Sequence, residues 1–99
     1  MEIRHIEGRK RGAFVIKREQ ERLAELTYSK PDDKSIDIDH TEVDEGLRGQ
    51  GIGEKLVKEA VGFAREKGLK ITATCPYASK LLGRNDEYSD VYITNDPDD

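Results

Sequence analysis

Three glycines at alternate positions, Gly49, Gly51 and Gly53, stand between a β-rich segment and the clearest amphipathic pattern of the chain. Glycine lets the backbone turn sharply and lets a ligand approach the main chain closely. The first amide groups of a helix have no partners within the helix, and together with the helix dipole they form a site for anions such as phosphate. The sequence therefore predicts a strand, a tight turn and a helix whose first turn can face an anionic ligand.

The helix is expected over residues 50–67, where apolar side chains recur at helical spacing. The apolar positions are Ile52, Leu56, Val57, Ala60, Phe63 and Ala64. Charged residues occupy the opposite side, and Gly68 suits the position that closes a helix. A second, short helix is expected over residues 77–82, with Pro76 at its start and Gly83 after it.

Strand-like segments lie on both sides of the long helix. They are residues 3–6, 13–17, 23–28, 35–43, 71–75 and 88–93. Short turns join the early segments, which favours an antiparallel meander. The strand, helix and strand within residues 36–75 form a βαβ unit, whose two strands pair in parallel with a right-handed crossover. The expected fold class is therefore α+β, a mixed and mostly antiparallel sheet with a central parallel pair.

The strand at residues 35–43 changes phase within its length. Ile36 and Ile38 share one face and His40 continues it, but the next apolar residue, Val43, falls on the other register. A β-bulge inserts one residue and redirects the side chains that follow. We therefore expect a bulge near residues 40–42.

Composition limits the classes of partner. The 99 residues are expected to form one domain, residues 1–99, and they carry a net charge of −4. Nucleic-acid-binding proteins usually concentrate basic charge on one surface, whereas the short basic run at residues 9–11 is interpreted as a solvated turn. No apolar run reaches the roughly 18 residues of a membrane span. No signal-peptide pattern opens the chain, and its single cysteine excludes an intrachain disulfide. We expect a cytoplasmic protein, a monomer or weak dimer, without a nucleic-acid, membrane or metal partner.

The glycine turn meets neither of two common nucleotide-binding patterns. A P-loop requires Lys and Ser or Thr where Ile52 and Gly53 stand. A dinucleotide-binding fingerprint requires glycine where Glu54 stands. Glycine spacing alone therefore leaves open a tight turn that binds nothing.

Arg48, Gly51 and Gly53 together resemble the Gln/Arg-x-x-Gly-x-Gly/Ala signature of the GNAT acetyltransferase superfamily. The segments 38–43, 47–53 and 70–76 look like its small single-domain group, the YjdJ type, and the resemblance covers about residues 36–92. It implies a minimal GNAT fold in which the central parallel strands splay to bind coenzyme A. It also implies an N-acetyltransferase that uses acetyl-CoA and an unidentified amine. The alternatives are a non-catalytic coenzyme A or acyl-CoA binding module and a small interaction domain with an empty turn.

The resemblance also implies which residues bind the cofactor. These are Thr41, Glu42, Val43, Arg48, Gly49, Gln50, Gly51, Ile52 and Gly53. In the family, the signature residues cradle the pyrophosphate and the pantetheine arm lies between the two strands like an extra strand. An amide at the bulge can polarise the thioester carbonyl.

Cys75 and His40 are the predicted catalytic residues. Cys75 directly precedes the expected short helix, a position that favours thiolate, and the resemblance implies that it lies close to the thioester. Histidine is a residue type that can exchange protons under physiological conditions, so His40 suits a general base or an activator of the thiol. A buried structural cysteine, a structural histidine and Glu42 acting as the base through water are the alternatives.

The usual proton donor of larger relatives is missing here. Many of them carry a tyrosine that protonates the leaving thiolate, but Leu82 takes that position in this chain. Cys75, Tyr77 and Tyr88 are possible substitutes, and transfer is either direct or through an acetyl-Cys75 intermediate. No helical pattern occurs before residue 50, so we expect an open acceptor site that suits an exposed amine on a protein or a polyamine.

Overall fold

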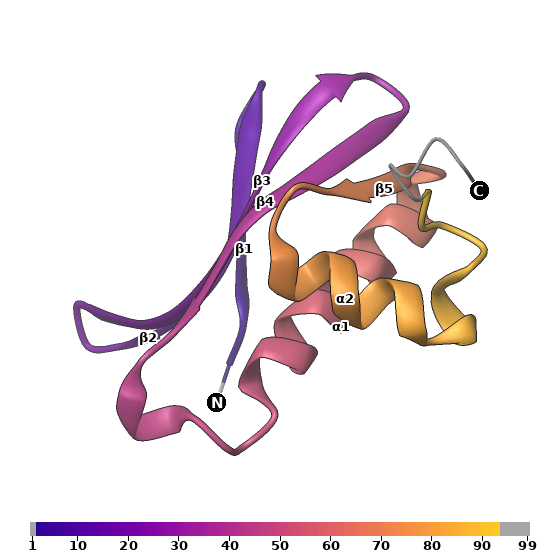
Figure 1. Ribbon diagram of the computed structural model, residues 1–99. Coiled ribbons are helices and arrows are strands. Elements are labelled where there is room, and N and C mark those ends of the chain that lie inside the picture. Colours follow the sequence, from indigo (N-terminus) through magenta and orange to yellow (C-terminus); the bar gives the residue numbers. More distant parts are fainter. Residues whose placement is uncertain (1, 94–99) are drawn as a thin grey trace.

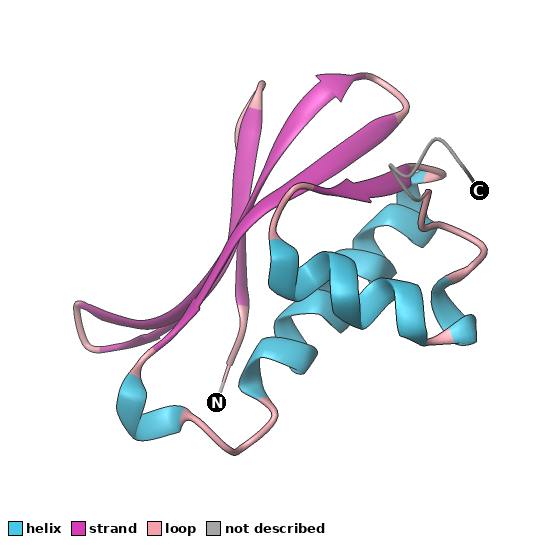
Figure 2. Ribbon diagram, in the orientation of Figure 1, coloured by secondary structure: helices cyan, strands magenta, loops and turns pink. Residues whose placement is uncertain are grey.

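Five strands form one sheet in the order β1-β2-β3-β4-β5, and both α-helices lie on the same side of it (Figures 1 and 2). The computed structural model describes residues 2–93. The strands are β1 (Arg4–Glu7), β2 (Arg11–Arg18), β3 (Glu21–Asp32), β4 (Ser35–Val43) and β5 (Lys70–Ala73). The α-helices are α1 (Ile52–Lys67) and α2 (Pro76–Arg84), and two short 3-10 helices are η1 (Glu45–Leu47) and η2 (Asp86–Tyr88).

The pairing pattern confirms the expected α+β class. Strands β1 to β4 form an antiparallel meander, and β5 pairs with β4 in parallel after the crossover through α1. The parallel ladder is short and runs from the Ser35–Lys70 pair to the Ile38–Ala73 pair. It lies at one end of the sheet rather than at its centre, because no further strand forms beside β5 within the described residues.

The strand expected at residues 88–93 does not form, and that prediction is wrong. Local hydrogen bonds hold this segment in turns, since the Tyr92 amide donates to the Tyr88 carbonyl at 2.9 Å. Only one isolated bridge joins the segment to β5, between Tyr92 and Ile71. The Arg65 guanidinium on α1 also binds both carboxylate oxygens of Asp90 at 2.9 Å, which fixes the turn against the helix.

The core lies between one face of the sheet and the two helices. Side chains from β3, β4 and α1 are fully buried there, among them Leu26, Tyr28, Ile36, Ile38, Leu56 and Val57. An aromatic group closes the β1 end of this layer, where the rings of His5 and Phe14 stack with centroids 4.1 Å apart. The other face of the sheet carries no helix (Figure 1). In the described part of the chain, no helix is long and apolar enough to cross a membrane.

Candidate active site

Strands β4 and β5 separate at the point where their ladder ends. The amides of Thr74 and Cys75 both donate to the Ile38 carbonyl, each at 3.0 Å. Beyond Ile38, β4 continues to Val43 without a β5 partner, while the chain after Cys75 turns into α2. This splayed pair has the geometry that the family resemblance implies.

A β-bulge at Asp39 redirects the side chains of β4. Ile38 lies opposite Tyr28 and His40 lies opposite Thr27, so Asp39 is the extra residue. The bulge therefore lies one position before the predicted residues 40–42. The prediction that His40 continues the face of Ile38 is therefore wrong. The bulge turns His40 toward the helix-free side of the sheet.

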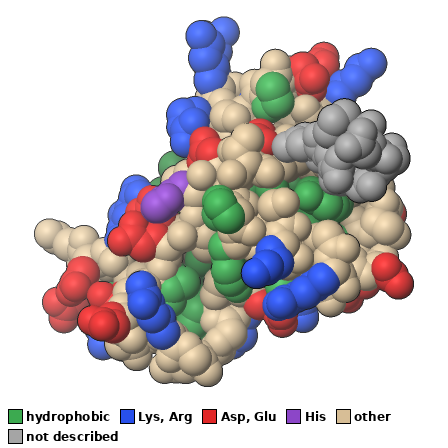
Figure 3. Space-filling model, in the orientation of Figure 1, with side chains coloured by type: hydrophobic (Ala, Val, Ile, Leu, Met, Phe, Trp, Pro, Cys, Tyr) green, Lys and Arg blue, Asp and Glu red, His purple; other side chains and the backbone are tan. Residues whose placement is uncertain are grey.

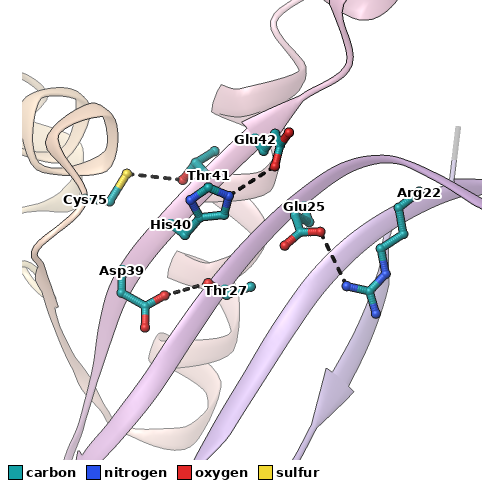
Figure 4. A network of polar contacts seen from close by, with 8 residues as sticks. All are labelled: Arg22, Glu25, Thr27, Asp39, His40, Thr41, Glu42 and Cys75. Carbon is teal, nitrogen blue, oxygen red and sulfur yellow. Dashed lines mark hydrogen bonds and ion pairs between the residues drawn. The ribbon is translucent and has the colours of Figure 1, made fainter.

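After the bulge, β4 presents different residues to its two sides (Figure 4). Thr41 faces the helical layer, where the Cys75 thiol donates to its hydroxyl oxygen at 3.6 Å. His40 faces the free side, where its Nε2 lies 3.2 Å from a carboxylate oxygen of Glu42. The His40 side chain is 53% exposed, whereas Cys75 is buried. The structure thus does not bring Cys75 and His40 together but places them on opposite sides of one strand.

The loop after β4 provides no side-chain cap for the first backbone amides of α1. A carboxylate oxygen of Asp44 accepts from the Gly46 amide at 3.0 Å, and buried Leu47 anchors the loop to the core. Gly51 ends the loop at φ +72°, a left-handed conformation that L side chains rarely adopt. It is the N-cap of α1 and provides no side-chain cap, and the first intrahelical bond runs from the Lys55 amide to the Gly51 carbonyl at 3.1 Å.

A groove of about 290 Å³ runs from the splayed end of β4 to the first turn of α1. It is lined by Thr41, Val43, Leu47, Arg48, Gly49, Gly51, Ile52, Gly53 and Tyr77. Seven of the nine predicted cofactor-binding residues are among them; Glu42 and Gln50 are not. Neither Cys75 nor His40 lines the groove, although Cys75 contacts its wall through Thr41.

Leu47 and Tyr77 line the groove without having been predicted to bind the cofactor. Leu47 is the one apolar residue between Val43 and Ile52, which is a signal for a loop anchor. Tyr77 projects from α2 over α1, where a Cβ added to Gly53 would lie 2.6 Å from the tyrosine oxygen.

The surroundings of the Tyr77 phenol raise its pKa. Partial burial of the ring has the largest effect, nearby Glu54 raises the pKa further, and Arg84 lowers it. Tyr77, one of the possible substitutes for the missing acid, lines the groove where it lies over Gly53. Tyr88, another possible substitute for the missing acid, is buried and does not line the groove.

Comparisons with known proteins agree with this geometry. The family model of the GCN5-related N-acetyl-transferases matches residues 13–91. Protein NATD1 of Xenopus tropicalis is 40% identical over 62 residues, and human Protein NATD1 is 39% identical over the same length. These matches cover 63% of this chain but only 57% and 55% of the two relatives, so the chain spans little more than half of their length.

Solved structures share the fold. The NMR solution structure of a GCN5-like protein from Staphylococcus aureus has a TM-score of 0.74 and 42% identity, over 97% of this chain and 91% of that one. A GNAT family acetyltransferase from Elizabethkingia anophelis, with acetyl-CoA bound, has a TM-score of 0.60 and 20% identity, over 76% of this chain and 52% of its own. At this lower identity the likeness concerns the fold alone.

Proposed function

This chain belongs to the GCN5-related N-acetyltransferase family, and from that membership we propose that it binds acetyl-CoA in the groove and transfers the acetyl group to an amine. The observation that carries the proposal is the groove that connects the splayed end of β4 to the uncapped first turn of α1. One end of this groove suits a phosphate group, and the other end lies at a gap between two strands.

The first turn of α1 is the proposed site for the pyrophosphate. The amides of Ile52, Gly53 and Glu54 precede the first intrahelical bond and so have no acceptor within the helix. The helix dipole adds roughly half a positive charge at this end. Arg48 lines the same part of the groove and adds a full positive charge.

The free edge of β4 is the proposed track for the pantetheine arm. The Asp44 amide donates to the Leu23 carbonyl at 2.7 Å, so this residue directs its main chain toward β3. Adjacent residues of a strand direct their backbone N–H and C=O groups to opposite edges. Thr41 and Val43 therefore direct these groups into the gap between β4 and β5. An extended chain with amide groups can pair with such an edge as an added strand would.

The acceptor amine is proposed to approach from the helix-free side of β4. His40 lies on that side, with Glu42 positioned to orient its ring, and it can take the proton of an incoming ammonium group. The neutral amine nitrogen then attacks the thioester carbon. A C–N bond forms, the C–S bond breaks, and coenzyme A leaves as a thiolate that must take up a proton.

Cys75 lies beside the proposed position of the thioester, on the side away from His40. Its thiol can protonate the leaving thiolate after direct transfer. It can also accept the acetyl group first, in which case its own C–S bond forms as that of acetyl-CoA breaks. Intact-mass spectrometry after incubation with acetyl-CoA separates these routes, because only the second adds an acetyl group that Cys75→Ser abolishes.

The proposed function is tested by mixing the pure protein with acetyl-CoA and a panel of amines and measuring free thiol. Release of thiol with at least one amine, above a no-protein control, is the expected result. Calorimetric binding of acetyl-CoA without thiol release from any amine would instead identify a non-catalytic acyl-CoA binding module. Absence of binding would leave the small interaction domain with an empty turn.

A further inference from the structure

Asp37 of β4 binds two threonine side chains of β5 at the place where the two strands separate. Its two carboxylate oxygens accept from the Thr72 hydroxyl at 2.6 Å and from the Thr74 hydroxyl at 2.8 Å. Both contacts lie on the helix-free face of the sheet, because the neighbours Ile36 and Ile38 are buried in the core and side chains alternate along a strand. These two contacts are called the Asp37 clamp below.

The two threonines take different places relative to the parallel ladder. Thr72 lies directly opposite Asp37, and the last pair of the ladder is made by Ile38. Thr74 lies one residue beyond that pair, where its amide and the amide of Cys75 share one acceptor, the Ile38 carbonyl. The Thr74 hydroxyl therefore adds a side-chain contact to β4 at the residue where regular pairing ends.

Cys75 directly follows this contact. Its side chain is only 5% exposed, and its thiol donates to the hydroxyl of Thr41, which lines the groove. Figure 3 shows hydrophobic side chains at the surface along the junction of the sheet with the helices, where the groove lies. Cys75 is also the N-cap of α2. The position of the thiol thus depends on the end of β5 on one side and on the start of α2 on the other.

We infer that Asp37 is a positioning residue, which fixes Thr74, sets the point where β4 and β5 separate, and so keeps the Cys75 thiol against Thr41. The carboxylate lies on the face opposite the helices and acts on the thiol only through Thr74 and the main chain. The effect on turnover rests on the proposed function, whereas the position of the thiol can be measured without any substrate.

Thr74→Val and Thr74→Ser form a matched pair that tests the clamp. Valine keeps the shape of threonine without the hydroxyl and favours strands, whereas serine keeps the hydroxyl and favours strands less. Alkylation by iodoacetamide, followed by intact-mass spectrometry, measures exposure of the thiol, because Cys75 is the only cysteine of the chain. Thr74→Val should be alkylated about 2- to 10-fold faster than the wild type, the range expected for loss of one hydrogen bond, and Thr74→Ser at the wild-type rate.

Two further variants and a titration locate the effect. Asp37→Ala removes the acceptor of both threonines and should accelerate alkylation at least as much as Thr74→Val. Ser35→Ala removes a similar contact at the far end of the same ladder, where the Ser35 hydroxyl donates to Asp32 at 3.0 Å, and should keep the wild-type rate. Low concentrations of urea should not accelerate alkylation of Thr74→Val, because local opening of a strand end exposes little surface.

The thiol-release assay measures the effect on turnover. Thr74→Val should lower kcat about 2- to 10-fold while the affinity for acetyl-CoA stays within about twofold of the wild-type value, and Thr74→Ser should retain the wild-type kcat. A general loss of stability would instead affect the serine variant more than the valine variant, in the order of their strand propensities.

Three outcomes distinguish the inference from the proposed function. Equal alkylation rates for Thr74→Val and Thr74→Ser, or a faster rate for the serine variant, would overturn the inference. A rate for Thr74→Val that rises with urea in step with global unfolding would overturn it as well. Absence of turnover in the wild type would refute the proposed function alone, because the alkylation rates still decide whether Asp37 positions the thiol.

Discussion

The hydroxyl of Tyr77 on α2 lies over the α-carbon of Gly53 on α1, so close that a Cβ at position 53 would be 2.6 Å from the tyrosine oxygen. The contact joins the two helices at the proposed pyrophosphate end of the groove. The family signature accepts glycine or alanine at this position, but in this chain an alanine would have to displace the end of the Tyr77 side chain. The groove and the identity of residue 53 are therefore coupled through Tyr77.

Gly53→Ala should weaken acetyl-CoA binding by about 10-fold, because the added methyl group must displace the Tyr77 ring that lines the groove. Stability should change by less than about 1 kcal/mol, since alanine favours the helix and the displaced atoms end an exposed side chain. Calorimetry and urea unfolding measure the two effects. In a Tyr77→Ala background, Gly53→Ala should have no further effect on binding; an undiminished effect there would show that Tyr77 is not the cause.

Gly51→Ala and Gly62→Ala should change stability in opposite directions. Gly51 has a φ of +72°, where a Cβ meets no neighbour but the backbone conformation itself costs about 1–2 kcal/mol for an L residue. Gly62 lies inside α1 with open space around it, so alanine there should stabilise the protein by about 0.5–1 kcal/mol. The midpoint of urea unfolding should fall for the first variant and rise for the second. Equal shifts would contradict the left-handed N-cap.

Much of the fold could be predicted from the sequence because its signals are local. The apolar spacing of α1 and the β-rich segments of the meander depend on residues close in the chain. The segment at residues 88–93 was predicted wrongly because its composition favours a strand, whereas local hydrogen bonds and contacts from elsewhere in the chain hold it in turns. Those contacts include the fork of Arg65 on Asp90, whose partners are 25 positions apart.

The site was predictable only in part for the same reason. The change of phase in β4 indicated a bulge, but which residue is the extra one depends on the neighbouring strand. Thr27 of β3 pairs with His40, which leaves Asp39 as the extra residue. The Asp39 carboxylate accepts from the Thr27 hydroxyl at 2.5 Å. The position of the extra residue decides on which side His40 lies. Tyr77 reaches the groove through the packing of α2 beside α1, and no periodicity of the sequence contains that information.

His5 should make stability depend on pH near neutrality. Desolvation lowers the pKa of its partly buried ring and Lys30 lowers it further, while Glu7 and Glu59 act in the opposite direction. Its Nε2 lies 2.6 Å from the Tyr28 hydroxyl. As the pH falls below about 6.5, the unfolded chain takes up a proton that the folded ring resists, so the free energy of unfolding should decrease.

Urea unfolding at pH 7.5, 6.5 and 5.5 measures this dependence. The His5→Gln variant should lose stability more slowly than the wild type over the same range, because it lacks the group whose pKa differs between the two states. Identical slopes for the two proteins would assign the pH dependence to other groups.

His40→Gln should lower turnover without changing cofactor binding. His40 lies on the helix-free side of β4 and does not line the groove, so the affinity for acetyl-CoA should stay within about twofold of the wild-type value, while kcat should fall about 10²- to 10⁴-fold, the usual contribution of a general base. Arg48→Gln should show the reverse, with weaker binding of acetyl-CoA and kcat retained at saturation. The two variants thus separate the helix-free side of β4 from the cofactor groove, and steady-state kinetics with the best amine of the panel gives both quantities.

The residues around His40 sharpen this last test. Glu42→Gln keeps an acceptor near the ring but removes the charge that stabilises an imidazolium, so it should lower kcat less than His40→Gln does. Lys17→Gln changes a charge elsewhere on the helix-free face, opposite Arg22, and should retain full turnover. If His40→Gln instead raised the KM for acetyl-CoA and left kcat intact, the histidine would act on the cofactor side. The amine would then have to enter from the helical layer, through the space next to Cys75.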